Sequence, residues 1–149
     1  MFLSVNRMLP LFAAVIACTD SLAPRDVAGS YVLESINGQN LPVVIGPIPE
    51  ETITVLSGGI ALHEDGNAVT VERRREVSDN VPSENNYIFE QSFHLDGNRI
   101  RIFPPPFCPP NALALCVEIE GVITDSVLTL EIGPFIYLYR RAELSTQNP

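Results

Sequence analysis

The chain has 149 residues, of which 46% are hydrophobic, so it has the length of one domain and the composition of an ordinary globular protein rather than a disordered one. It has 18 acidic and 9 basic residues, all nine of them arginine, and a formal net charge of -9. Because an acidic chain is repelled by polyanions, this balance argues against nucleic-acid binding. Thirteen prolines and nine glycines fall mostly between apolar runs, which favours short strands joined by turns.

The N-terminus is typical of an export signal. Arg7 precedes an uncharged, largely apolar stretch over residues 8–17. As a helix, ten residues rise about 15 Å, against roughly 30 Å of membrane hydrocarbon, so this stretch fits a signal h-region better than a membrane span. Val15 and Ala17 also suit an ordinary signal peptidase. Two further alternatives are that the cysteine that ends this stretch, Cys18, is incidental to the signal, or that the stretch is an N-terminal helix retained in the fold.

The sequence "VIAC" at 15–18 resembles a bacterial lipobox. This resemblance implies that residues 1–17 are a lipoprotein signal peptide, that it is removed, and that Cys18 is acylated. The mature protein would then be anchored to a membrane of the bacterial cell envelope without spanning it. Residues 18–26 form an expected tether. Thr19, rather than an aspartate, follows the cysteine, which slightly favours the outer membrane.

From residue 27 to residue 141 apolar residues recur with period two, which predicts strands. In the first strand, Tyr31 and Leu33 share one face and Val32, Glu34 and Ile36 the other, which predicts partial burial on both sides. The remaining expected strands are listed in chain order: 52–62, 67–77, 87–95, 99–103, 116–123, 126–132 and 135–141.

Turn signals separate these strands. Asn37-Gly38 predicts a hairpin turn, and Asp-Gly-Asn at 65–67 and again at 96–98 predicts two more. Gly58-Gly59 marks an expected bulge or bend, the proline-containing segment 41–51 belongs on an edge or in a loop, and 78–86 reads as a polar loop. Together these signals predict an all-β antiparallel meander of about eight strands over 27–141, closing into a barrel or curled sheet, with a flexible tail at 142–149.

Four stretches resemble small bacterial lipocalin-like lipoproteins: "GSYVLESINGQNLP" at 29–42, "LHEDGNAVTV" at 62–71, "GVITDSVLTLEI" at 121–132 and "YLYRR" at 137–141. The resemblance implies a barrel that binds a small apolar ligand or an envelope partner and catalyses nothing. It also implies that Arg140, beside Tyr139, stacks over the closed end of the barrel. If the protein is a carrier, these inward residues would line its cavity: Tyr31, Leu33, Phe89, Phe93, Tyr137 and Tyr139.

Cys108 and Cys116 are close in sequence, and in an exported protein such a pair predicts a disulfide that closes a short loop. A redox pair is the alternative, although the Cys-x-x-Cys spacing typical of one is absent. With the disulfide formed, the proline-rich segment 104–110 would be an extended, rigid contact surface. This surface suggests two alternative functions for the protein: a cavity-free structural or interaction module, or an inhibitor of an envelope hydrolase.

The remaining chemical signals are weak. His63 and His94 each lie near an Asp-Gly turn, where exposed surface residues are expected more than a zinc site. The cluster "ERRRE" at 72–76 predicts an exposed strand end with cross-strand ion pairs; an anion site is the alternative. No nucleophile elbow, phosphate loop or dinucleotide fingerprint occurs. We therefore expect no enzyme activity, no cofactor and no metal.

Overall fold

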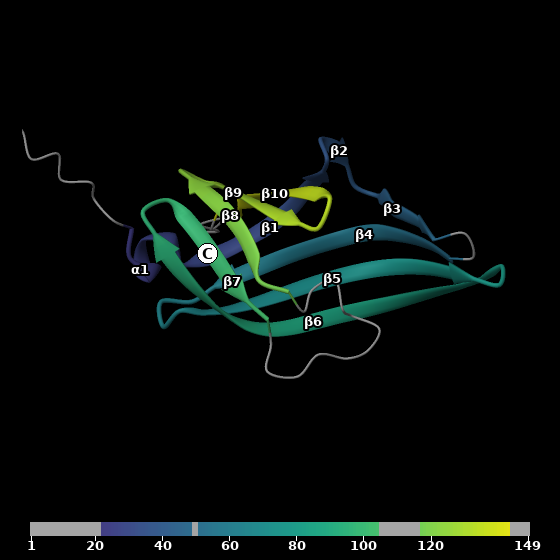
Figure 1. Cartoon of the computed structure of the whole chain (residues 1–149), viewed down its shortest axis with the longest axis horizontal. Helices are drawn as coiled ribbons and strands as arrows, with labels where there is room; N and C mark the ends of the chain where they lie inside the picture. Colours follow the sequence, from purple (N-terminus) through teal and green to yellow (C-terminus); the bar gives the residue numbers. More distant parts are fainter. Residues whose placement is uncertain (1–21, 49–50, 105–116, 144–149) are drawn as a thin grey trace, which may run out of the picture.

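The computed structural model describes residues 22–48, 51–104 and 117–143. They form one antiparallel sheet of ten strands and one short helix (Figure 1). The elements are α1 (Pro24–Val27), β1 (Gly29–Ile36), β2 (Gln39–Asn40), β3 (Val43–Ile48), β4 (Glu51–Leu62), β5 (Asn67–Ser78), β6 (Val81–Asp96), β7 (Arg99–Phe103), β8 (Ile119–Thr124), β9 (Val127–Ile132) and β10 (Phe135–Arg141).

Eight of these strands close into a barrel. Each strand from β4 to β10 pairs with the next, and β1 pairs on one side with β10 and on the other with β4. β2 and β3 lie outside the ring, β2 beside β1 and β3 beside β4. This confirms the predicted all-β antiparallel barrel, and the edge position of β3 confirms the expectation for segment 41–51.

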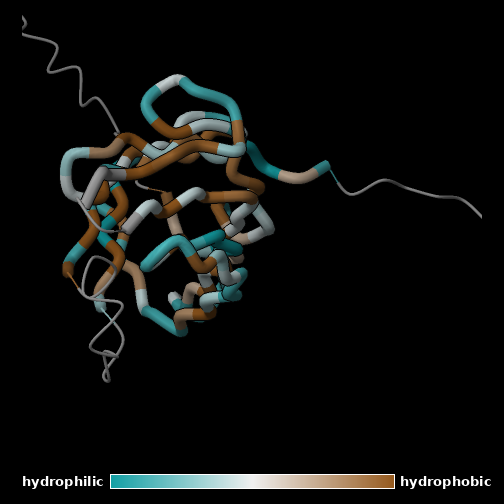
Figure 2. The backbone as a smooth tube through the Cα atoms, turned by 90° about the vertical axis from the view of Figure 1, so that its right-hand side faces the viewer, coloured by the Kyte–Doolittle hydropathy of each residue, from teal (hydrophilic) through white to brown (hydrophobic). Residues whose placement is uncertain are grey.

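Side chains alternate between the barrel interior and the solvent, so hydrophobic and hydrophilic residues alternate along the strands (Figure 2). In β1, Tyr31 and Leu33 are buried, whereas Val32 is 53% exposed and Glu34 is exposed. The prediction that both faces of this strand are partly buried is therefore wrong for its first part. Ile36 does join the interior, because an irregularity between Leu33 and Ser35 shifts the register of β1 against β10.

The predicted turns are confirmed. β1 and β2 are joined by Asn37 and Gly38, both with positive φ (51° and 75°), as a tight hairpin of this sequence requires. Gly66 and Gly97 also have positive φ and lie between β4 and β5 and between β6 and β7. These glycines let the chain reverse where other residues would be strained.

The predicted polar loop at 78–86 is wrong. β5 and β6 are joined directly at Asp79-Asn80, and β6 begins at Val81. Polar pairs between β5 and β6 stabilise the first part of β6: the guanidinium groups of Arg73 and Arg75 donate to Glu84 at 2.5 and 2.7 Å. Residue-by-residue propensity misses such pairs because the partners lie about ten positions apart.

Gly58 and Gly59 lie where β1 closes the barrel against β4. The irregularity in β4 lies just before them, between Val55 and Ser57. A Cβ at Gly58 would lie 3.0 Å from Leu33 Cδ2, and one at Gly59 would lie 3.1 Å from the carbonyl oxygen of Tyr31. The two glycines therefore allow the close approach of the closing strand.

α1 lies at one end of the barrel (Figure 1). The Tyr31 hydroxyl donates to the Val27 carbonyl at 2.8 Å, and the Arg141 guanidinium donates to the Ala28 carbonyl and lies 6.0 Å from the centroid of the Tyr31 ring. The expectation that Arg140 stacks at this end is wrong by one position. Arg140 points outward and donates to Glu34 at 2.8 Å, since neighbouring strand residues face opposite sides.

Three predicted features lie outside the described residues: Cys18 with its signal, the Cys108–Cys116 pair, and most of segment 104–110. Within the part of the chain that the structure describes, no helix is long and apolar enough to cross a membrane.

Candidate functional site inside the barrel

The six residues predicted to line a cavity all point into the barrel. Tyr31 and Leu33 come from β1, Phe89 and Phe93 from β6, and Tyr137 and Tyr139 from β10, and each is at most 6% exposed. The rings of Tyr137 and Tyr139 stack with their centroids 6.4 Å apart. The interior wall is thus apolar and includes five aromatic rings among aliphatic side chains.

Polar side chains also line this interior. Thr70, Glu72 and Arg74 of β5 and Gln91 of β6 are all buried, at 3% to 8% exposure. We call these four residues the inner polar column. The three β5 residues are spaced by two, so they share the inward face of one strand. Thr70 pairs in register with Phe89, and Glu72 with Tyr87.

Sequence reasoning missed this column because it assigned "ERRRE" to an exposed strand end. The expected exposure and cross-strand pairing are confirmed for Arg73 and Arg75. Glu72 and Arg74 are buried, and β5 lies between β4 and β6 rather than at an edge, so that part of the prediction is wrong. The signal that could have found them is the strand period of two: residues 70, 72 and 74 lie on the same face of the strand as the apolar Ala68, which is buried.

Glu72 and Arg74 form an ion pair inside the barrel. Arg74 Nε donates to Glu72 Oε1, and the two side chains are 9% and 2% exposed respectively. Burial raises the pKa of Glu72, and the attraction of Arg74 only partly offsets this. Burial alone would lower the pKa of Arg74, but the pairing with Glu72 outweighs it and raises that pKa. Arg74 therefore stays charged, and Glu72 holds a proton more tightly than an exposed glutamate does.

Aromatic rings surround this ion pair. The Arg74 guanidinium carbon lies 5.0 Å from the centroid of the Tyr87 ring, a cation–π distance. Tyr87 donates its hydroxyl proton to Glu76 and stacks on Phe89 with centroids 6.3 Å apart. Burial, and then the negative charge of Glu72, raise the pKa of Tyr137 above its usual value. The Tyr137 hydroxyl is hence a neutral hydrogen-bonding group at physiological pH.

Gln91 has one half of its amide unsatisfied. The Thr70 hydroxyl donates to Gln91 Oε1 at 2.9 Å. Gln91 Nε2 is buried and has no hydrogen-bond partner among the described residues. An unpaired donor in a dry interior costs about 1 to 3 kcal/mol, so this atom needs an acceptor that the described chain does not supply.

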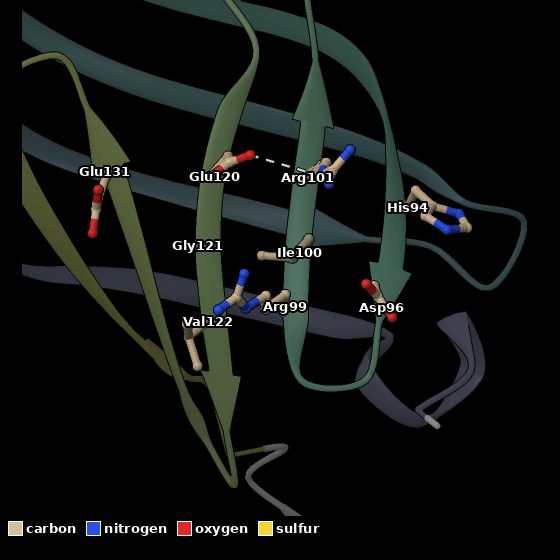
Figure 3. Close-up of a pocket in the computed structure, with 9 residues that line it drawn as sticks. All are labelled: His94, Asp96, Arg99, Ile100, Arg101, Glu120, Gly121, Val122 and Glu131. Carbon is tan, nitrogen blue, oxygen red and sulfur yellow. Dashed lines mark ion pairs between the residues drawn. The ribbon is translucent and has the colours of Figure 1, made fainter. Parts of the chain in front are cut away.

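A second candidate is a hollow of about 270 Å³ on the outer face of β6 to β9 (Figure 3). Arg101 lies 3.7 Å from Glu120 there, and both side chains are more than half exposed. Solvent screens such pairs, and their stabilisation is small. Two more hollows open near β5 and β6, and none of the six predicted cavity residues lines any of the three.

The histidines do not form a site. His63 and His94 are exposed, as predicted for surface residues near turns. His94 lies at the rim of the outer hollow and points away from Arg101 (Figure 3). No group of three or more metal-binding side chains occurs within residues 22–48, 51–104 and 117–143.

Comparison with protein-family models, curated proteins and solved structures returned no match for this chain. The chemistry of the barrel interior is therefore derived from its own residues.

Proposed function

We propose that this protein is a lipid-anchored lipoprotein of the bacterial cell envelope whose lipocalin-like barrel binds a small apolar molecule without catalysing a reaction. The observation that carries this proposal is the closed barrel, whose apolar interior includes aromatic rings and also holds buried polar groups. A barrel of eight strands is just wide enough to be filled by its own side chains or to hold one small ligand.

The inner polar column favours the ligand reading. A buried ion pair contributes little net stability, and hydrophobic residues of similar size in its place are often neutral or stabilising. A barrel that serves only as a packed core gains nothing from Glu72 and Arg74 or from an amide with an unpaired donor. A binding site does need a few polar groups within an apolar wall, because these orient the ligand.

The end of the barrel near α1 supports the lipocalin likeness. An aromatic residue of the first strand, Tyr31, lies under a cation from the last strand, Arg141, and both are tied to the residues just before β1. This is the stacking that the resemblance implies, with Arg141 in place of Arg140. It leaves the opposite end, toward Arg74 and Tyr87, as the proposed side of ligand entry.

The anchor rests on the N-terminal sequence, that is Arg7, the apolar stretch 8–17 and "VIAC" at 15–18. Cys18 is the proposed acylation site, since a thiol is required for a thioether-linked lipid. Cells that express the protein and take up radiolabelled palmitate should label it, and Cys18→Ser should abolish the label. Equal labelling of both forms would refute the anchor. The proposed disulfide between Cys108 and Cys116 is tested separately, by the mass increase of two hydrogen atoms on reduction.

The second candidate is a cavity-free interaction module. It is favoured by the low exposure of the six inward residues, which a fully packed interior also produces. Native mass spectrometry of the full-length protein purified from expressing cells separates the two. A retained molecule that dissociates on unfolding supports the carrier. A clean apo mass, together with a crystal structure in which side chains fill the interior, supports the interaction module and refutes the carrier.

A further inference from the structure

Gln91 is the most constrained of the polar groups in the barrel. It is 6% exposed, its Oε1 accepts from Thr70, and its Nε2 has no partner among the described residues. The amide is therefore oriented by Thr70, and its free donor remains inside the barrel. An oriented, buried and unpaired donor is the arrangement that a binding site needs to recognise one oxygen atom.

Apart from Thr70, which contacts the amide, the inward side chains beside Gln91 on β6 and opposite it on β5 are apolar. Ala68 is its register partner on β5, and Phe89 and Phe93 precede and follow it on the inward face of β6; all three are buried. Ala68 has the smallest of these side chains and extends only a methyl group toward the interior. Besides the Thr70 hydroxyl, which already donates to Gln91 Oε1, these neighbours offer a water at Nε2 no polar side chain, and a buried water needs two to four polar partners. A ligand oxygen is therefore a suitable acceptor for Nε2.

The charges of the inner polar column select a neutral acceptor. Along β5, Glu72 is two residues from Thr70, which holds the amide, and Arg74 is four, which is about 7 and 13 Å at the rise of a strand. An anionic group at Gln91 would meet the carboxylate of Glu72 before the guanidinium of Arg74, and Arg74 is already paired with Glu72. A carboxylate head group is thus disfavoured, and an uncharged carbonyl oxygen is favoured.

We propose that Gln91 is a ligand-recognition residue, whose Nε2 donates a hydrogen bond to the neutral carbonyl oxygen of an acyl ester or amide held among Phe89, Phe93 and the tyrosines of the barrel. This inference rests on the proposed function and narrows its ligand class. It adds a specificity group to an otherwise apolar wall, and Thr70 is the positioning residue that orients the amide.

The test uses the full-length chain made by membrane-free cell-free synthesis, so that it has no bound lipid. N-phenyl-1-naphthylamine, which is fluorescent and has no carbonyl, reports binding to the apolar wall. Methyl decanoate, which has an ester carbonyl, displaces it. Gln91→Leu should weaken methyl decanoate about fivefold, the loss of about one neutral hydrogen bond, and leave the affinity for the probe within about twofold.

Two further variants serve as a surface control and as a test of the positioning role of Thr70. Gln39→Leu makes the same chemical change at an exposed position of β2 and should alter neither affinity. Thr70→Val leaves the amide in place without the hydroxyl that orients it, and should weaken methyl decanoate less than Gln91→Leu does. If Gln91→Leu does not fold, Gln91→Met, which has a similar length and lacks the amide, takes its place.

The outcomes separate this inference from the proposed function. If probe and ester bind the wild type and Gln91→Leu weakens neither, or both equally, the inference is overturned and the apolar binding function stands. If neither compound binds the wild type, both are overturned. A crystal structure in which Gln91 Nε2 holds the same water with and without methyl decanoate also overturns the inference, because the amide would then be a purely structural group.

Discussion

Replacing the two members of the buried ion pair should have unequal effects. Arg74→Met leaves the Glu72 carboxylate, with its 2% exposed side chain, without its partner. Removing one partner of a buried pair costs about 3 to 5 kcal/mol. Glu72→Leu should cost more, because it leaves a buried guanidinium that cannot lose its charge. When Arg74 is removed instead, the Glu72 carboxyl can take up a proton, since burial already raises its pKa.

The double variant Glu72→Leu/Arg74→Met should be as stable as the wild type or more stable, because two desolvation costs disappear together. The four proteins form a double-mutant cycle, measured at pH 7 as free energies of unfolding in urea. Circular dichroism is the suitable signal, since the chain has no tryptophan. Arg73→Met is the matched control: it breaks a solvent-exposed pair with Glu84 and should cost less than about 1 kcal/mol.

The result that would refute this reasoning is additivity. If Arg74→Met and Glu72→Leu each cost no more than Arg73→Met and their effects sum to within about 0.5 kcal/mol, the pair is solvated rather than buried. The polar column would then be an exposed strand face, and the case for a buried binding site would lose its main support.

Three more predictions follow from the same structure. Folding raises the pKa of Glu72, so the folded state holds this proton more tightly than the unfolded state does. The free energy of unfolding of the wild type, relative to that of Glu72→Gln, should therefore fall as the pH rises from about 4.5 through the raised pKa. Parallel pH profiles of the two proteins would contradict the burial of Glu72. Gly121→Ala places a Cβ 2.3 Å from the Thr129 carbonyl oxygen and should cost about 1 to 3 kcal/mol in urea unfolding, whereas Glu120→Ala, exposed on the same strand, should be nearly neutral. Arg141→Leu should lower the free energy of unfolding by about 1 to 2 kcal/mol by removing the contacts with Ala28 and Tyr31, more than Arg140→Leu does; equal effects would argue against the Tyr31–Arg141 contact.

The sequence by itself determined the strands, most of the turns and the class of fold. Period-two alternation can be recognised within a single strand, and Asn37-Gly38 is a local signal because both residues adopt positive φ readily. The inward positions of Tyr31, Phe89 and Tyr139 followed from the same local rule. The export signal and the acylation of Cys18 remain predictions from the sequence.

The tertiary structure decided which polar residues lie inside. Glu72 and Arg74 read as solvated because charged residues are rarely buried, and only the pairing of β5 between β4 and β6 encloses them. Arg141 rather than Arg140 reaches Tyr31 because the register of β10 against β1 fixes which of two neighbouring residues faces inward. The Arg141 contact depends on two strands about a hundred residues apart, and no local pattern contains their register. For Glu72 and Arg74 the period-two spacing is local, but only closure of the barrel decides which face of β5 lies inside.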